Sequence, residues 1–151
     1  MKFFNNIKTF IENLKGKGQI FLNNTQTKLY NLYQTNYDTG MYHINHGNIL
    51  DATFRFKFIT KLWPNDIDAR YYFAYCLVLN EFYLDAKTQL NQILKLEPNN
   101  VRGQDLLNKI NNGEVRQLVY DYKKLHNLLE EETATDTNED KEDNNKNRDN
   151  I

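Results

Sequence analysis

Two histidines are the first candidates for chemistry in this sequence. His43 and His46 lie three residues apart, a spacing at which two imidazoles on one helix face can share a metal ion. Asp38 and Asp51 are carboxylates nearby in the sequence. A metal site needs three or four ligands held by further hydrogen bonds, and no second pair of His or Cys residues accompanies these two. We therefore expect neither a metal nor another cofactor.

Cys76 is the single cysteine, so it has no partner for an intramolecular disulfide or a cysteine metal site. No base or cation adjoins it in the sequence, and we expect a buried, inert thiol in a reducing compartment. His126, alone near the end of the last expected helix, is interpreted as a surface residue. The sequence has no Gly-rich phosphate-binding loop and no Ser/His/Asp arrangement. We therefore expect a protein that is not an enzyme.

Charge is distributed unevenly along the 151 residues, although the formal net charge is only -1. Residues 130–151 contain nine acidic and three basic residues and almost no apolar ones. Such a segment cannot bury enough apolar surface to offset its ordering entropy, so we expect an acidic disordered tail. Residues 1–32 contain five lysines and one glutamate. These are too few cations to predict a nucleic-acid partner.

Residues 2–15 have an apolar residue at nearly every third or fourth position, which predicts an amphipathic helix. The apolar stripe consists of Phe3, Phe4, Ile7, Phe10, Ile11 and Leu14. Gly16 and Gly18 end this helix, because glycine is costly in a helix interior. Two interpretations stay open. The helix either caps the next helices, or lies on an anionic membrane with its lysines at the head groups.

The N-terminal segment also bears on localisation. Its first residues do not lead into a continuous apolar run, so a cleaved secretory signal is not expected. No stretch of the sequence approaches the ~20 apolar residues that a membrane-spanning helix needs. We expect a soluble cytoplasmic protein or, in the second interpretation above, one peripheral to the cytoplasmic face of a membrane.

The helical period continues to residue 129 and predicts an all-α fold without strands. One expected helix, at 20–36, runs into a second that begins at Tyr33 and ends near residue 46. The next begins at Ile49 and ends before Pro64. A second pair runs from Ile67 to a turn near residues 80–81 and returns to Pro98. The last two helices are expected at 101–110 and 114–129.

Three pairs of small or helix-breaking residues share an offset of 34: Gly40 and Ala74, Ala52 and Ala86, and Pro64 and Pro98. A constant offset of this length is typical of repeat proteins, in which one helix pair cannot bury its apolar face alone. The pattern resembles the tetratricopeptide repeat (TPR) family, which has an early small residue, an Ala, an aromatic and a late Pro at these positions. The aromatic position holds Phe56 in the repeat at 33–66 and Leu90 in the repeat at 67–100.

The match to the family is partial. Asn36 and Arg70 replace its usual Trp, and His43 and Leu77 replace its usual Tyr. A third unit begins at residue 101, but Tyr120 stands at its Ala position, so it is interpreted as a capping pair. The resemblance covers about residues 33–112 and implies a short, right-handed superhelical stack of antiparallel helix pairs. Residues 1–32 would cap this TPR-like α-solenoid, which spans 33–129.

The resemblance also implies a concave groove, lined by the first helix of each pair, that holds an extended peptide or a helix of another protein. The groove positions hold Gln34, Tyr37, Asp38, Met41 and Ile44, then Asp68, Tyr71, Tyr72, Tyr75 and Val78. Tyrosine suits recognition because it offers a large apolar surface and a hydroxyl. In the alternative, some of these tyrosines pack in the core. Co-chaperone members of the family use Lys and Asn residues to clamp a C-terminal carboxylate. This chain has Tyr37 and Met41 at those positions instead.

We therefore expect a non-catalytic interaction module that binds a segment of another protein, such as an adaptor, an assembly factor or a small chaperone. In length and architecture the chain is similar to the small bacterial chaperones of secretion translocators. The alternative is a membrane-peripheral scaffold, anchored through residues 2–15, that displays the repeats to a partner.

Overall fold

The computed structural model describes residues 19–129, and their side chains from residue 24 onward. This part of the chain contains six α-helices and no strand, which confirms the expected all-α class. The helices are α2 (Gln19–Asn45), α3 (Ile49–Leu62), α4 (Ile67–Leu79), α5 (Tyr83–Leu96), α6 (Val101–Asn112) and α7 (Val115–Leu125). The helix predicted at 2–15 and the tail predicted at 130–151 lie outside the described residues.

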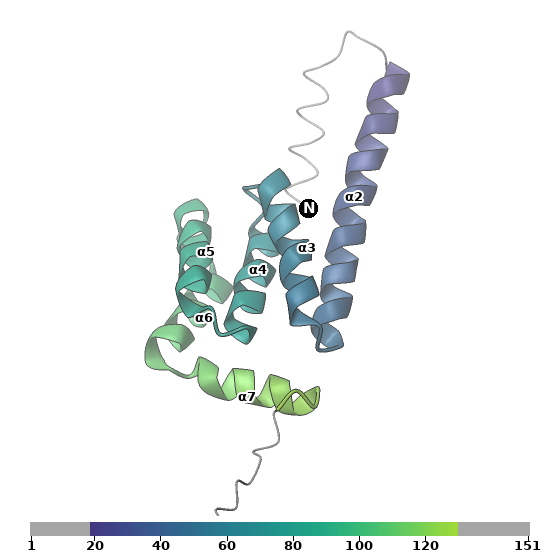
Figure 1. Cartoon of the computed structure of the whole chain (residues 1–151). Helices are drawn as coiled ribbons and strands as arrows, with labels where there is room; N and C mark the ends of the chain where they lie inside the picture. Colours follow the sequence, from purple (N-terminus) through teal and green to yellow (C-terminus); the bar gives the residue numbers. More distant parts are fainter. Residues whose placement is uncertain (1–18, 130–151) are drawn as a thin grey trace, which may run out of the picture.

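Helix α2 is continuous over 27 residues and joins the two helices expected at 20–36 and 33–46. It projects beyond the end of α3, as Figure 1 shows. The helix continues through Gly40, where the absence of a side chain leaves room for the ring of Phe56 on α3. The helix ends before Gly47, whose φ of 79° suits glycine and turns the chain into α3.

Helices α2 to α6 each pack on their neighbours in the sequence, and the short turns between them make successive helices antiparallel. Helix α7 departs from this order and runs across one end of the other helices (Figure 1). The Tyr122 hydroxyl on α7 donates a hydrogen bond of 2.5 Å to the Ile44 carbonyl near the end of α2. The expected antiparallel capping pair is therefore a helix, α6, followed by one that crosses the ends of the stack.

The two central helix pairs are related by the repeat offset found in the sequence. Helix α3 begins at Ile49 and ends at Leu62, and α5 begins at Tyr83 and ends at Leu96, so both bounds shift by that offset. The offset also relates the two N-terminal caps that follow. Asp66 accepts a hydrogen bond of 2.9 Å from the Ala69 amide, and Asn100 accepts one of 2.9 Å from the Gly103 amide.

Contacts between helices repeat with the same offset. Arg55 on α3 donates a hydrogen bond of 3.1 Å to Asn36 on α2. At the equivalent places, Arg70 on α4 donates one of 2.6 Å to Gln89 on α5, so the donor has moved to the other helix. The helices of both pairs therefore meet in the same register, although the residue types differ.

The core runs through the middle of the stack, and its large side chains meet small ones. The fully buried residues of α3 and α5 include Ala52, Phe56 and Ile59, then Ala86, Leu90 and Ile93. Close approach of the helices depends on the small residues, and the large ones fill the space beside them. None of the described helices combines the length and the apolar character needed to cross a bilayer.

Candidate functional site

Four tyrosines on α2 and α4 form one continuous aromatic surface, which we call the tyrosine face: Tyr37, Tyr71, Tyr72 and Tyr75. All four are half-buried. The ring of Tyr72 lies between those of Tyr37 and Tyr71, with centroids 5.8 and 5.6 Å away and nearly perpendicular planes. Tyr71 and Tyr75 are four residues apart and so share one side of α4, with ring centroids 6.5 Å apart. The sequence prediction of a Tyr-lined surface thus corresponds to rings that contact one another.

Phe56 of α3 supports the tyrosine face from the core. Its ring stacks on Tyr72 at 5.3 Å and meets Tyr37 edge-on at 5.5 Å. Phe56 itself is fully buried. Each of the four tyrosine rings contacts at least one neighbouring ring, so packing holds it in place. Such rings are already ordered and lose little entropy on binding.

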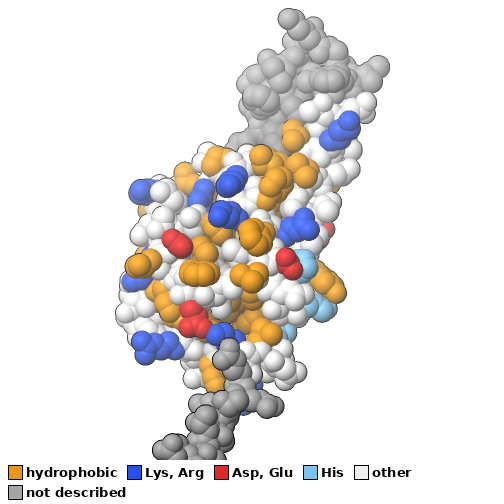
Figure 2. All heavy atoms as spheres, viewed as in Figure 1, with side chains coloured by type: hydrophobic (Ala, Val, Ile, Leu, Met, Phe, Trp, Pro, Cys, Tyr) orange, Lys and Arg blue, Asp and Glu red, His pale blue; other side chains and the backbone are white. Residues whose placement is uncertain are grey.

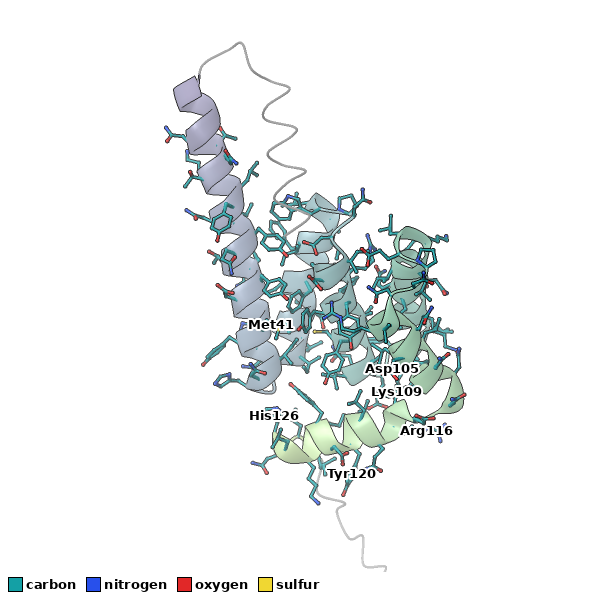
Figure 3. The ribbon with its side chains drawn as sticks, turned by 180° about the vertical axis from the view of Figure 1, so that it is seen from behind. Met41, Asp105, Lys109, Arg116, Tyr120 and His126 are labelled. Atoms are coloured by element: carbon teal, nitrogen blue, oxygen red, sulfur yellow. The ribbon has the colours of Figure 1, made fainter. Side chains whose placement is uncertain are left out.

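The face continues onto α6, where the equivalent positions are charged. Asp105 and Lys109 stand one repeat after Tyr71 and Tyr75, and they form an ion pair of 2.8 Å. Figure 3 shows these two residues on α6 and Met41 across the stack on α2. Met41 is partly buried and packs on the core beside the tyrosines.

Arg102 joins α6 to the tyrosine face through two contacts. Its guanidinium forms an ion pair with Asp68 of α4 and lies 4.6 Å from the centroid of the Tyr71 ring. Burial lowers the pKa of Arg102, but the hydrogen bond and charge of Asp68 outweigh this and raise it. A charged guanidinium over an aromatic ring is favourable. Arg102 was not among the predicted site residues, although it stands one repeat after Asp68 and the repeat offset could have indicated it.

Three hydroxyls of the tyrosine face, those of Tyr37, Tyr71 and Tyr75, keep their protons at neutral pH. Burial raises the pKa of Tyr37, Tyr71 and Tyr75 above the ordinary value of 10.0. For Tyr37 the neighbouring Tyr72 adds to this effect, and for Tyr71 the positive charge of Arg102 opposes it. Each of these hydroxyls can therefore both donate and accept a hydrogen bond.

The prediction that Ile44 and Val78 line the surface of the groove is wrong. Ile44 is 7% exposed and Val78 is 0% exposed, so both belong to the core. The physical reason is that α4 lies at the centre of the stack and packs on α3, α5, α6 and α7, which cover most of its surface. At Ile44 the end of α2 is covered by Tyr122 of α7.

Of the polar residues in the predicted groove, Asp38 and Asp68 are exposed and Gln34 is half-buried. Asp38 accepts a hydrogen bond of 2.9 Å from Gln34, one turn earlier on α2. Asp68 is exposed as well, but it is engaged by Arg102. Asp68 is therefore paired, whereas Asp38 takes part in none of the ion pairs within the described residues and leaves one negative charge on this surface.

The histidines do not assemble a metal site. His43 Nδ1 is buried and has no hydrogen-bond partner among the described residues, whereas His46 Nδ1 lies 2.8 Å from the Tyr42 carbonyl. Within residues 19–129 no three or more His, Cys, Asp or Glu side chains are close enough to hold a metal. His126, predicted at the surface, is half-buried against the α2–α3 turn. Cys76 is buried as predicted, and burial raises the pKa of its thiol to about 12.

In the described part of the chain the tyrosine face combines ordered rings, hydroxyls that can donate and accept hydrogen bonds, and two ion pairs at its border. A comparison of the chain with family models, with curated proteins and with solved structures finds no match.

Proposed function

We propose that this protein is a non-catalytic protein-binding module that holds a peptide or a helix of a partner on the tyrosine face. The observation that carries the proposal is the set of four half-buried tyrosine rings that contact one another along α2 and α4. Half-buried tyrosines give large contact area at a low cost in entropy, and their hydroxyls can pair with a peptide backbone.

The repeated contacts support a TPR-like, right-handed superhelical stack as the scaffold. Helix bounds, N-terminal caps and hydrogen bonds between helices all recur at the repeat offset. In such a scaffold the first helix of each pair lines the binding surface, and here these helices are α2, α4 and α6. The adaptor, assembly-factor and small-chaperone roles all follow from this binding mode.

The charges around the face indicate the kind of partner. Arg102 is engaged by Asp68, and Lys109 by Asp105, so neither cation is free to clamp a terminal carboxylate. The partner we propose is a neutral segment with apolar side chains for the rings and backbone groups for the hydroxyls. An acidic peptide would have to break an existing ion pair in order to bind through Arg102 or Lys109.

Affinity capture from native lysate with matched variants tests the proposal. Tyr71→Ala with Tyr75→Ala should lower capture of the main partner at least tenfold, since each change removes about 1 kcal/mol or more of contact. Tyr120→Ala is the control, because Tyr120 is an exposed tyrosine on α7 (Figure 3). Equal capture by the wild type, the double variant and the control would refute the proposal.

A second variant separates binding from folding. Tyr71→Phe with Tyr75→Phe keeps both rings and removes only the hydroxyls, so the core packing persists. We expect intermediate capture by this variant and an unchanged circular dichroism spectrum. Capture by the phenylalanine variant equal to that of the wild type would show that the hydroxyls have no binding role. An unfolded alanine variant would show that the fold needs the two rings.

A further inference from the structure

Helix α3 carries a row of large apolar side chains that the core does not use. Leu50, Phe54, Phe58 and Leu62 are 64%, 67%, 39% and 48% exposed. They are spaced by four residues, so they form one continuous ridge along the helix surface. We call these four residues the α3 ridge. Single exposed apolar residues are ordinary, but four adjacent ones on one helix mark an interaction surface.

The α3 ridge points away from the core and from the tyrosine face. Phe54 and Phe58 each stand two residues from the buried Phe56, which places them about 160° away around the helix. Phe56 contacts Tyr37 and Tyr72 on the inner side of α3. Figure 2 views the outer side and shows hydrophobic side chains gathered over α3. A ligand on the α3 ridge would leave the tyrosine face accessible.

The charges beside the ridge are mostly positive. Helix α3 contains Arg55, Lys57 and Lys61 but only one carboxylate, Asp51. All four are exposed, and Figure 2 shows Lys and Arg side chains beside the hydrophobic ones. Lys57 and Lys61 take part in none of the ion pairs formed within residues 19–129. The ridge therefore combines Phe and Leu with unpaired cations, which is the chemistry of a surface that meets anionic lipid.

Other occupants fit the ridge less well. A second copy related by a twofold axis would bring the same lysines together across the interface. The acidic residues 130–151 have the complementary charge but almost no apolar side chains to cover the ridge. Residues 2–15 are apolar but basic, like the ridge itself. A partner helix is normally seated in a groove between two helices, whereas this row is the outer edge of a single one.

We propose that the α3 ridge docks this protein on an anionic lipid bilayer. Phe54 and Phe58 enter the boundary between head groups and acyl chains, and Lys57 and Lys61 meet the anionic head groups. The contact is peripheral. It is a function in addition to partner binding, and it turns the tyrosine face toward the aqueous side.

Sedimentation of the full chain with vesicles tests the proposal. Binding should be weak to phosphatidylcholine vesicles and strong to vesicles that also contain phosphatidylserine. Phe54→Ser with Phe58→Ser should lower the partition coefficient at least tenfold. The control is Val101→Ser with Leu125→Ser, two positions on α6 and α7 that are as exposed as Phe54. Lys57→Gln with Lys61→Gln should cost about fivefold per lysine, and added salt should reproduce the loss.

Three outcomes would overturn the proposal. One is no binding to phosphatidylserine vesicles. Another is binding that the α3 variants leave intact and that Phe3→Glu with Phe10→Glu abolishes, which would assign it to residues 2–15 alone. The third is dimerisation, measured by light scattering without lipid, that Phe54→Ser with Phe58→Ser removes, because a second copy would then cover the ridge. Circular dichroism of every variant verifies the fold, and Phe54→Ser alone, at the most exposed position, serves if the double variant unfolds.

Discussion

The contact between Gly40 and Phe56 offers the sharpest test of how the helix pairs are packed. A Cβ added at Gly40 would stand 2.7 and 2.9 Å from two carbons of the Phe56 ring. The ring cannot retreat easily, because it is fully buried and is held by Tyr72 at 5.3 Å and Tyr37 at 5.5 Å. We therefore predict that Gly40→Ala destabilises the protein, although alanine is the better helix former.

Two opposed effects set the change in the free energy of unfolding of Gly40→Ala. Replacing glycine by alanine inside a helix gains about 1 kcal/mol of intrinsic helix propensity. Forcing one methyl group into a filled core costs about 1–3 kcal/mol. Because the contact is to a ring that packing holds in place, we expect the cost near the upper end. Gly40→Ala should lower the free energy of unfolding by about 1–2 kcal/mol.

The second helix pair shows how the clash can be relieved. At the positions equivalent to Gly40 and Phe56 it has Ala74 and Leu90, both fully buried. Phe56→Leu alone leaves a small cavity and should cost about 1–2 kcal/mol. In the double variant the new methyl group occupies part of that cavity, so the two losses should not add. We expect a favourable coupling free energy of about 1–2 kcal/mol.

Urea unfolding of the four proteins, followed by far-ultraviolet circular dichroism, measures the coupling. Unchanged dependence of the free energy on urea would show that the denatured state is comparable in all four. A Gly40→Ala variant that is more stable than the wild type would refute the prediction, because the Phe56 ring would then move aside at little cost. Single effects that add to within about 0.5 kcal/mol would contradict the predicted coupling.

Two further predictions concern a turn and the crossing helix. Glu81 has a φ of 64°, a left-handed conformation that glycine adopts more easily, and the equivalent residue Gly47 has a φ of 79°. Glu81→Gly should therefore raise the free energy of unfolding by about 0.5–1 kcal/mol, even though the exposed ion pair with Lys123 is lost. An unchanged urea midpoint would contradict this prediction. Tyr122→Phe removes the hydrogen bond to the Ile44 carbonyl and should cost about 1 kcal/mol. Because burial raises the pKa of Tyr122 from 10.0 to about 12, the wild-type hydroxyl keeps its proton up to a higher pH in the folded state than in the unfolded state. Wild-type stability should therefore fall more steeply than that of the variant as pH rises from 10 toward 12, and equal slopes of the urea midpoint in this window would refute the assignment.

Local signals in the sequence determined the helices and their ends. Pro64 and Pro98 limit α3 and α5, because proline disfavours helical conformation in the residue before it. Asp66 and Asn100 start α4 and α6 by capping amides three residues later. Gly113, with a φ of 77°, ends α6. Each signal acts within about one helical turn, so it can be read without knowledge of distant contacts.

The repeat offset also predicted which helices share a face. It grouped Tyr37 of α2 with Tyr71 and Tyr75 of α4, and the structure places their side chains along one surface. Applied to α6, the same offset would have added Arg102 and Lys109 as the charged border. The pattern identifies equivalent positions, but equivalent positions do not have equal exposure.

Only the tertiary structure decided which of those positions are covered, and by what. Ile44 and Val78 occupy predicted groove positions, yet α7 covers the end of α2 and four helices surround α4. The path of α7 follows from long-range contacts such as that of Tyr122 with Ile44, which are 78 residues apart. Likewise the α3 ridge is exposed because no other described helix packs on that side of α3, although its residues are as apolar as those of the core. Burial is a property of pairs of distant segments, so a pattern along one segment cannot determine it.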